Sequence, residues 1–69
     1  MPDLSLTVNG RPRSIPGPAT LEDLLRGLGL DARTVVVEHN RRIVRRPKLG
    51  ATTLATGDAV ELVHFVGGG

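Results

Sequence analysis

One short segment of this chain has the apolar spacing of a helix, and it limits what the other residues can form. Four leucines at offsets 0, 3, 4 and 7 share one helical stripe, namely Leu21, Leu24, Leu25 and Leu28. Thr20 is a typical N-cap, Asp23 completes a shortened capping box, and Gly29 stands where a left-handed C-cap would end the helix. We therefore expect one amphipathic helix of about two turns, packed on a sheet.

The residues before this helix predict a β-hairpin. Residues 4–8 alternate apolar and polar side chains, which is the pattern of a half-buried strand. Asn9-Gly10 follows, and this dipeptide tolerates positive φ at both central positions of a tight turn. Residues 11–15 then form the return strand. Pro12 and Pro16 have no backbone N–H, so this strand lies at a sheet edge or ends early.

The residues after the helix predict three further strands. Residues 34–38 are β-branched and apolar, and the lack of alternation over 35–37 favours a central strand. Asn40 can turn the chain before residues 41–45 continue in extended form. A loop with room for one short helical turn leads to the last strand, residues 59–66. The fold class is therefore α+β, a roll in which one helix crosses between the second and third of four to five strands.

The last strand places apolar side chains on both of its faces. If Val60 and Leu62 fill the core beneath the helix, Val63 and Phe65 lie on the opposite face. There they would form an exposed apolar spot suited to docking a partner. The alternative is that strand twist or a loop covers them.

Composition argues against catalysis by the chain itself. Without cysteine there is no disulfide, thiol nucleophile or thiolate metal site. His39 and His64 are the only histidines and have no further ligands at suitable spacing, so we expect no metal site. No Ser or Thr stands in a nucleophile and base pattern, and the carboxylates are scattered. With neither a membrane-length apolar run nor a signal peptide pattern, we expect a soluble protein of the cytoplasm.

Basic residues concentrate in one stretch. It holds five of the nine Lys and Arg residues, in a chain of net charge +2: Arg41, Arg42, Arg45, Arg46 and Lys48. Such a stretch suits an acidic protein surface or a phosphate backbone, or is simply a solvated hairpin. Without interleaved aromatic residues it lacks the stacking platform of single-strand binders. We take Arg42 and Arg45, with Phe65 and Val63, as the candidate partner-binding residues.

Three glycines follow the last strand. No helix comes after Gly67, Gly68 and Gly69, so they do not form a phosphate-binding loop. Without Cβ atoms they could form a thin arm that threads a narrow channel, with the Gly69 carboxylate as the reactive group. A carboxylate is a poor electrophile until a partner converts it with ATP to an acyl-adenylate, which a sulfur nucleophile can turn into a thiocarboxylate. The alternative is an unimportant chain end.

The segment from Gly57 to Gly69 resembles the end of the sulfur carrier proteins of thiamine biosynthesis, the ThiS family. The resemblance covers nearly the whole chain, through four earlier segments in family order: residues 6–10, 20–25, 35–40 and 54–58. It implies a ubiquitin-like β-grasp fold with a mixed sheet. Residues 1–66 would form the single domain and residues 67–69 a flexible glycine tail.

The resemblance also implies a set of partners. An E1-like, ThiF-like adenylyltransferase would charge Gly69 with its own ATP and Mg²⁺, so the chain itself would bind no cofactor and would be no enzyme. A cysteine desulfurase or rhodanese would donate the sulfur, and a ThiG-like thiazole synthase would accept it. We expect a monomer when free, with no nucleic acid and no membrane among its partners.

One departure from the family pattern and one related family keep alternatives open. The family often ends in two glycines, whereas three stand here, so Gly67 belongs either to the arm or to the strand end. The related molybdopterin sulfur carriers also end in Gly-Gly, but they are longer and have an aromatic-proline segment that this chain lacks. Delivery to molybdopterin or to a cysteine synthase stays an alternative. So does a non-covalent ubiquitin-like module or nucleic-acid adaptor that uses the basic stretch.

Overall fold

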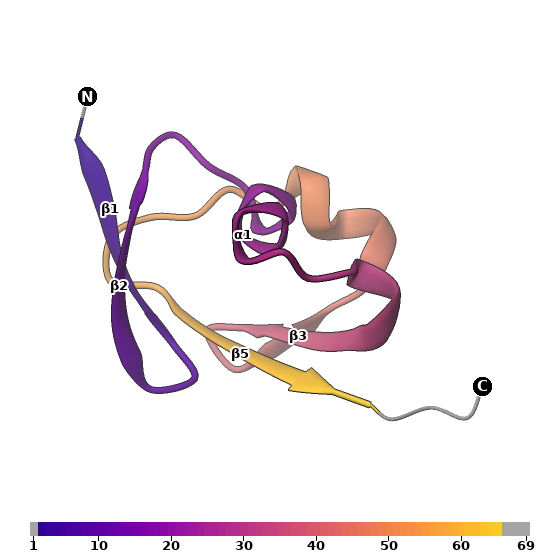
Figure 1. The fold of residues 1–69 in the computed structure, drawn as a ribbon. Helices are drawn as coiled ribbons and strands as arrows, with labels where there is room; N and C mark the ends of the chain where they lie inside the picture. Colours follow the sequence, from indigo (N-terminus) through magenta and orange to yellow (C-terminus); the bar gives the residue numbers. More distant parts are fainter. Residues whose placement is uncertain (1, 66–69) are drawn as a thin grey trace.

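The computed structural model describes residues 2–65, and their elements follow the predicted order (Figure 1). These are β1 (Asp3–Val8), β2 (Arg11–Pro16), α1 (Leu21–Leu28), the 3₁₀ helix η1 (Ala32–Thr34), β3 (Val35–His39), β4 (Arg42–Val44), the 3₁₀ helix η2 (Arg46–Ala51) and β5 (Ala59–His64). The prediction of an α+β fold with a mixed sheet and one main helix is confirmed. The predictions for Val66 and for the glycine tail 67–69 fall outside the described residues.

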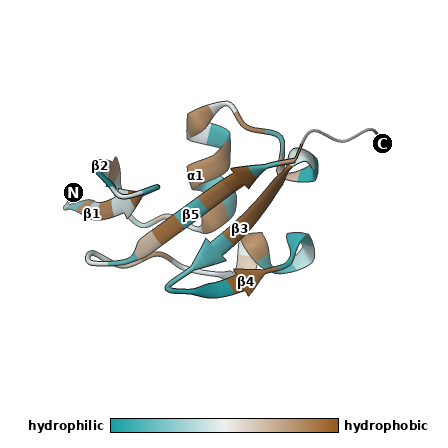
Figure 2. Cartoon of the chain, turned by 90° about the horizontal axis from the view of Figure 1, so that it is seen from below, coloured by the Kyte–Doolittle hydropathy of each residue, from teal (hydrophilic) through white to brown (hydrophobic). Residues whose placement is uncertain are grey.

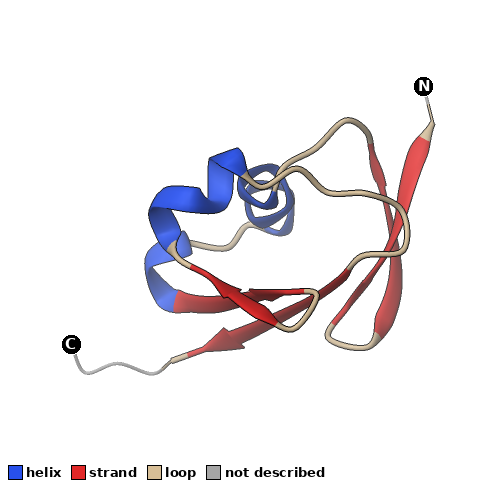
Figure 3. Cartoon of the chain, turned by 180° about the vertical axis from the view of Figure 1, so that it is seen from behind, coloured by secondary structure: helices blue, strands red, loops and turns tan. Residues whose placement is uncertain are grey.

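The five strands form one sheet in the order β2-β1-β5-β3-β4. The central pair, β1 and β5, is parallel, and the other pairs are antiparallel. Figure 3 shows the helices gathered on one side of the sheet. Strand β3 is an inner strand, as predicted, but its second residue Val36 is 39% exposed because the face away from α1 has no cover.

The first hairpin turns at Asn9 and Gly10, with φ of 51° and 78° as the dipeptide predicts. The Asn9 side chain adds a contact that the turn pattern does not reveal. Its Oδ1 accepts the Leu62 N–H at 2.7 Å, while the Asn9 N–H donates to the Val60 carbonyl at 2.9 Å. The turn is thereby tied to the central strand.

Strand β2 lies at the sheet edge, and its prolines occupy positions that suit an edge. Thr7 donates its N–H toward β5, to the Asp58 carbonyl at 3.0 Å, so its partner Pro12 faces away from β1. Pro16, opposite Asp3, has the same outward orientation. Because proline has no N–H, two outward donors are missing from this edge, which discourages pairing with another strand.

Helix α1 begins and ends where the caps predict. The Thr20 hydroxyl accepts the Asp23 N–H at 3.2 Å, and the Asp23 carboxylate accepts the Thr20 N–H at 2.9 Å, which makes a complete capping box. Gly29 follows the helix with φ of 73°, and its N–H donates to the Arg26 carbonyl at 3.1 Å.

The core lies between α1 and the sheet and is aliphatic. Its buried residues are Leu6, Ala19, Leu21, Leu24, Leu25, Val35, Val37, Leu49, Leu54, Val60 and Leu62. Leu49 and Leu54 come from the segment expected to be a loop with one helical turn. That segment contains η2, and its two leucines add to the core beside the helix.

The turn between β3 and β4 differs in detail from the prediction. Asn40 turns the chain, but Arg41 belongs to the turn instead of continuing the strand, because pairing of His39 with Arg42 leaves only two residues to reverse direction. Such a turn needs positive φ at both positions. Asn40 and Arg41 adopt 51° and 72°, a conformation uncommon for arginine.

A polar cluster ties this turn to the start of β5. Asp58 Oδ2 accepts hydrogen bonds from His39 Nε2 at 2.7 Å and from the Ala55 N–H at 2.9 Å. Asp58 Oδ1 accepts a hydrogen bond from Asn40 Nδ2 at 3.1 Å. The side chains of His39 and Asp58 are only 19% and 15% exposed. Burial raises the pKa of the Asp58 carboxyl, but the three hydrogen bonds outweigh it and lower that pKa below its ordinary value.

Asp58→Asn should therefore destabilise the fold in a pH-dependent way. A carboxyl whose pKa is lowered by folding stabilises the protein above its unfolded pKa, and the contribution is lost as the pH falls through the folded value. We expect a loss of about 1–3 kcal/mol in the free energy of unfolding near neutral pH, measured by urea denaturation. The loss should shrink as the pH falls below the ordinary pKa of an aspartate carboxyl and through the lower pKa of the folded state. Asp3→Asn, at an exposed residue, is the control, and a loss from Asp58→Asn that is equal at neutral and at acid pH would contradict this account.

Candidate docking face

The face of the sheet opposite α1 exposes a group of large apolar side chains. Val36, Ile43, Val63 and Phe65 are 39%, 64%, 58% and 50% exposed, and we call these four residues the apolar patch. Figure 2 views this face and shows hydrophobic colour along the halves of β3 and β5 nearest the C-terminus. Exposure of Val63 and Phe65 agrees with the alternation in the last strand.

The strand register brings the patch together. Val36 pairs with Val63, and the Phe65 N–H donates to the Thr34 carbonyl at 3.2 Å, which holds Phe65 beside the start of β3. Ile43 lies across from Glu38 on the neighbouring strand. Val36 and Val63 are directly opposed, which puts their Cβ atoms about 5 Å apart. Val36 also lines one hollow together with Ile43 and Phe65, so the four residues form one surface. Sequence reasoning missed Val36 and Ile43, because their side of the sheet depends on how β3 pairs with β4 and β5.

A shallow hollow of about 240 Å³ joins the patch to basic residues. Val36, Ile43 and Phe65 line it together with Arg33, Arg45 and Arg46.

Arg33 is bound within the chain. Its Nη2 lies 2.8 Å from Asp31 Oδ2, and its hydrogen bonds lower the pKa of the Asp31 carboxyl to about 2. By contrast, Arg45 and Arg46 are exposed and make no ion pair within residues 2–65. These two side chains remain available to an acidic partner.

Arg42 and Arg45, the two candidate partner-binding arginines, differ in their position relative to the apolar patch. Arg45 follows Ile43 and Val44 along the chain and lines the hollow beside Phe65. Arg42 pairs with His39 and lies away from that hollow. It lines another hollow, of about 490 Å³ along β4, which also includes Lys48 and Arg45. Arg45 therefore connects the patch with the rest of the basic stretch.

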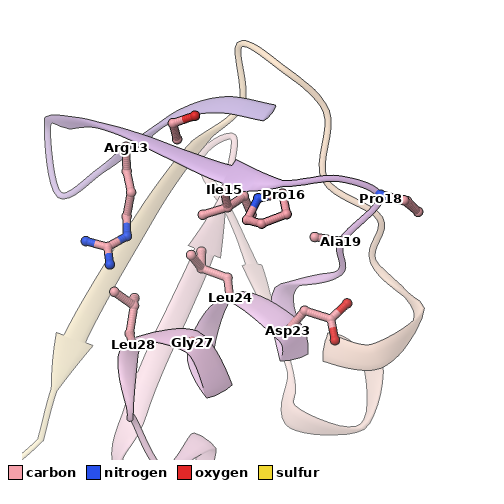
Figure 4. Close-up of a pocket in the computed structure, with 10 residues that line it drawn as sticks. Arg13, Ile15, Pro16, Pro18, Ala19, Asp23, Leu24, Gly27 and Leu28 are labelled. Atoms are coloured by element: carbon pink, nitrogen blue, oxygen red, sulfur yellow. The ribbon is translucent and has the colours of Figure 1, made fainter. Parts of the chain in front are cut away.

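A third hollow lies between β2 and α1 (Figure 4). It measures about 410 Å³, has Ile15, Leu24 and Leu28 in its lining, and receives Arg13 from one side and Asp23 from the other. Ser14 also lines it, but its hydroxyl makes only a long hydrogen bond, of 3.4 Å, to the Asp3 carboxylate, and no histidine or lysine among the residues lining the hollow could act as its base. The hollow therefore offers shape and apolar surface, but no catalytic arrangement.

Among residues 2–65, no three His, Asp or Glu side chains are grouped so that they could hold a metal ion. Within the same residues, no helix is long and apolar enough to cross a membrane.

Comparison with known proteins points to one family. The ThiS family model matches residues 6–69. The sulfur carrier protein ThiS of Bacillus subtilis is 40% identical over 50 residues, which cover 72% of this chain and 76% of that protein. The crystal structure of the thiamine biosynthesis protein ThiS from Geobacter metallireducens superposes with a TM-score of 0.82 at 40% identity, covering 96% of this chain and all of that one.

Longer relatives match as well. A thiazole synthase of Magnetococcus marinus is 42% identical over 66 residues, and one of Paramagnetospirillum magneticum is 39% identical over 66 residues. Each match covers 96% of this chain but only 20% of the relative, so the chain spans a fifth of the length of these synthases.

Replacing Leu62, inside β5, and Phe65, just after β5, should change the free energy of unfolding by very different amounts. Phe65→Ala should lower the free energy of unfolding by less than about 1 kcal/mol, because half of this side chain is already in water. Leu62→Ala, at a residue only 8% exposed, should cost about 2–5 kcal/mol. Urea denaturation of both variants measures the contrast. A loss of several kcal/mol for Phe65→Ala would mean that this side chain serves the core.

Proposed function

The chain belongs to the ThiS family, and we propose that it is a sulfur carrier of thiamine biosynthesis whose Gly69 carboxylate becomes a thiocarboxylate. The observation that carries this proposal is the family match over residues 6–69, which includes the three terminal glycines. The likeness to the Bacillus subtilis carrier and to the Geobacter metallireducens structure supports it.

The proposed chemistry takes place at a single carbon atom. The Gly69 carboxylate attacks the α-phosphate of ATP, pyrophosphate leaves, and an acyl-adenylate forms. A sulfide-level nucleophile then adds to the acyl carbon, the bond to the AMP oxygen breaks, and a thiocarboxylate remains. The activating partner supplies ATP, Mg²⁺ and transition-state stabilisation, so this chain binds no cofactor and acts as a substrate, not an enzyme.

The partners follow from this chemistry. An E1-like adenylyltransferase activates Gly69, and a cysteine desulfurase or rhodanese supplies the sulfur as a persulfide, all in the cytoplasm. A thiol must then cleave the S–S bond of the resulting acyl disulfide to leave the thiocarboxylate. A thiazole synthase accepts the sulfur. Two relatives named thiazole synthase support this acceptor, since a segment similar to this chain makes up a fifth of each.

Chain length indicates where the activating enzyme must touch the carrier. Gly69 stands four residues after Phe65. Four residues span at most about 14 Å even when fully extended. An enzyme that holds the Gly69 carboxylate in its site therefore also lies close to Phe65 and the rest of the apolar patch. We propose that this patch, with Arg45, is the docking surface.

Charging of Gly69 can be measured as a change in intact mass. Incubation with ATP, Mg²⁺, an E1-like adenylyltransferase and sulfide should add the mass difference between sulfur and oxygen. The variant lacking Gly69 should unfold at the same urea concentration as the wild type but show no gain, because it has lost the reactive carboxylate in its proper position.

No gain in the wild type with a competent activating enzyme would contradict the carrier function. That result would favour the alternative, a non-covalent module that binds its partner through the basic stretch. In that case Arg42→Glu with Arg45→Glu should abolish partner binding, and deletion of Gly69 should leave it intact.

The docking role of the patch calls for a separate measurement. Phe65→Ala should lower kcat/KM for charging by about tenfold, since a large apolar contact is lost at the interface. Lys48→Ala, which removes an exposed residue outside the patch, is the control. Equal charging by wild type and Phe65→Ala would remove the patch from the docking surface.

A further inference from the structure

Two glutamates oppose each other on the same open face of the sheet. Glu38 on β3 pairs directly with Glu61 on β5, two residues along from the pair of Val36 and Val63 and on the same face. Side chains at paired positions of antiparallel strands point to the same face, and like charges placed there destabilise a sheet. This arrangement therefore works against the stability of the fold.

Neither glutamate has an ion-pair partner within the described residues. Neither carboxylate takes part in a hydrogen bond there. On β4, the residue across from Glu38 is the apolar Ile43. The turn residue next along, Asn40, is committed to Asp58 and Ala59.

Charge along this face has a fixed order. Arg45 and Arg46 flank the hollow next to Phe65, and the two glutamates lie beyond Val36 and Val63, with Ile43 level with Glu38. Arg41, in the turn after β3, is the cation of the chain at the glutamate end. Figure 2 shows the same change along β3, from hydrophobic near the C-terminus to hydrophilic toward its far end. A partner with the reverse order of charges fits this face in one orientation, and a half-turn would bring like charges together.

We propose that Glu38 and Glu61 receive a lysine or arginine side chain of the activating adenylyltransferase and thereby set the orientation in which that enzyme docks. This inference rests on the proposed function. Three features select this occupant. The pair attracts a cation, it adjoins the apolar patch, and the patch lies within reach of the enzyme that holds Gly69. Orientation matters because only one of the two directions leads the chain after Phe65 toward the enzyme's site.

The double variant Glu38→Gln with Glu61→Gln tests the proposal, since glutamine keeps the size and removes the charge. The Kd for the adenylyltransferase, measured by calorimetry, should rise about tenfold or more and become less sensitive to salt. Charging at saturating enzyme should still reach completion. Glu22→Gln is the control, because Glu22 lies on α1 beside Arg26 and away from the open face.

Urea denaturation gives a second readout that needs no partner. The midpoint of the double variant should rise above that of the wild type, because the repulsion is removed. A fall in the midpoint would show that the pair stabilises the fold and would overturn the proposal. An unchanged Kd, or a rise equal to that of Glu22→Gln, would overturn it as well while leaving charging and the carrier function intact. Failure of the wild type to bind or be charged would overturn both.

Discussion

The alternation of side chains along β5 is the constraint on which the rest of the structure depends. This strand has neighbours on both sides, parallel β1 and antiparallel β3, so its position within the sheet is fixed along its length. Val60 and Leu62 fill the core under α1, while Glu61 and Val63 point to the open face. A shift by one residue would exchange these sets and would bury a carboxylate. One strand thus separates the residues that hold the fold from those that meet a partner.

Side chains from two turns hold the start of β5 in register. Asn9 accepts the Leu62 N–H, and Asn40 accepts the Ala59 N–H at 2.9 Å, so amide side chains continue the backbone ladder where neighbouring strands end. Asp58 joins this arrangement through His39. The contacts at Asp58 and Ala59 lie at the end of β5 far from Phe65, and the contact at Leu62 lies inside the strand. The apolar patch can therefore serve binding without being required to stabilise the register.

Much of the fold was predictable because its signals are local. The hairpin at Asn9-Gly10, the capping box at Thr20 and the end of α1 at Gly29 each depend on residues within a few positions of one another. The alternation in β5 likewise predicted that Val63 and Phe65 share a face. Local pattern could not reveal the contact of His39 with Asp58 or the opposition of Glu38 and Glu61. Those depend on the pairing of β3 with β5, which joins segments about twenty residues apart and is set by the whole sheet.

The residues of the apolar patch were likewise only partly predictable from local sequence pattern. Phe65 and Val63 were identified from one strand, but Val36 and Ile43 joined them only through cross-strand register. Arg42 and Arg45 are close in sequence, yet only Arg45 lines the hollow beside Phe65. Residues that are close in sequence on a strand can therefore lie on different faces. Residues that share a face are the better candidates for one binding surface.

A chain of this size is well suited to a function in which the chemistry belongs to the partner. Its core occupies one side of the sheet, so the opposite face is a surface that can be specialised for binding. Apolar side chains there can supply affinity, and charges at the two ends can supply direction. Direction matters more for a carrier than for an ordinary binding module, because four residues connect Phe65 to the proposed reactive carboxylate. If the carrier docked in the reverse orientation, these four residues would be too short to bring the Gly69 carboxylate to the enzyme's site.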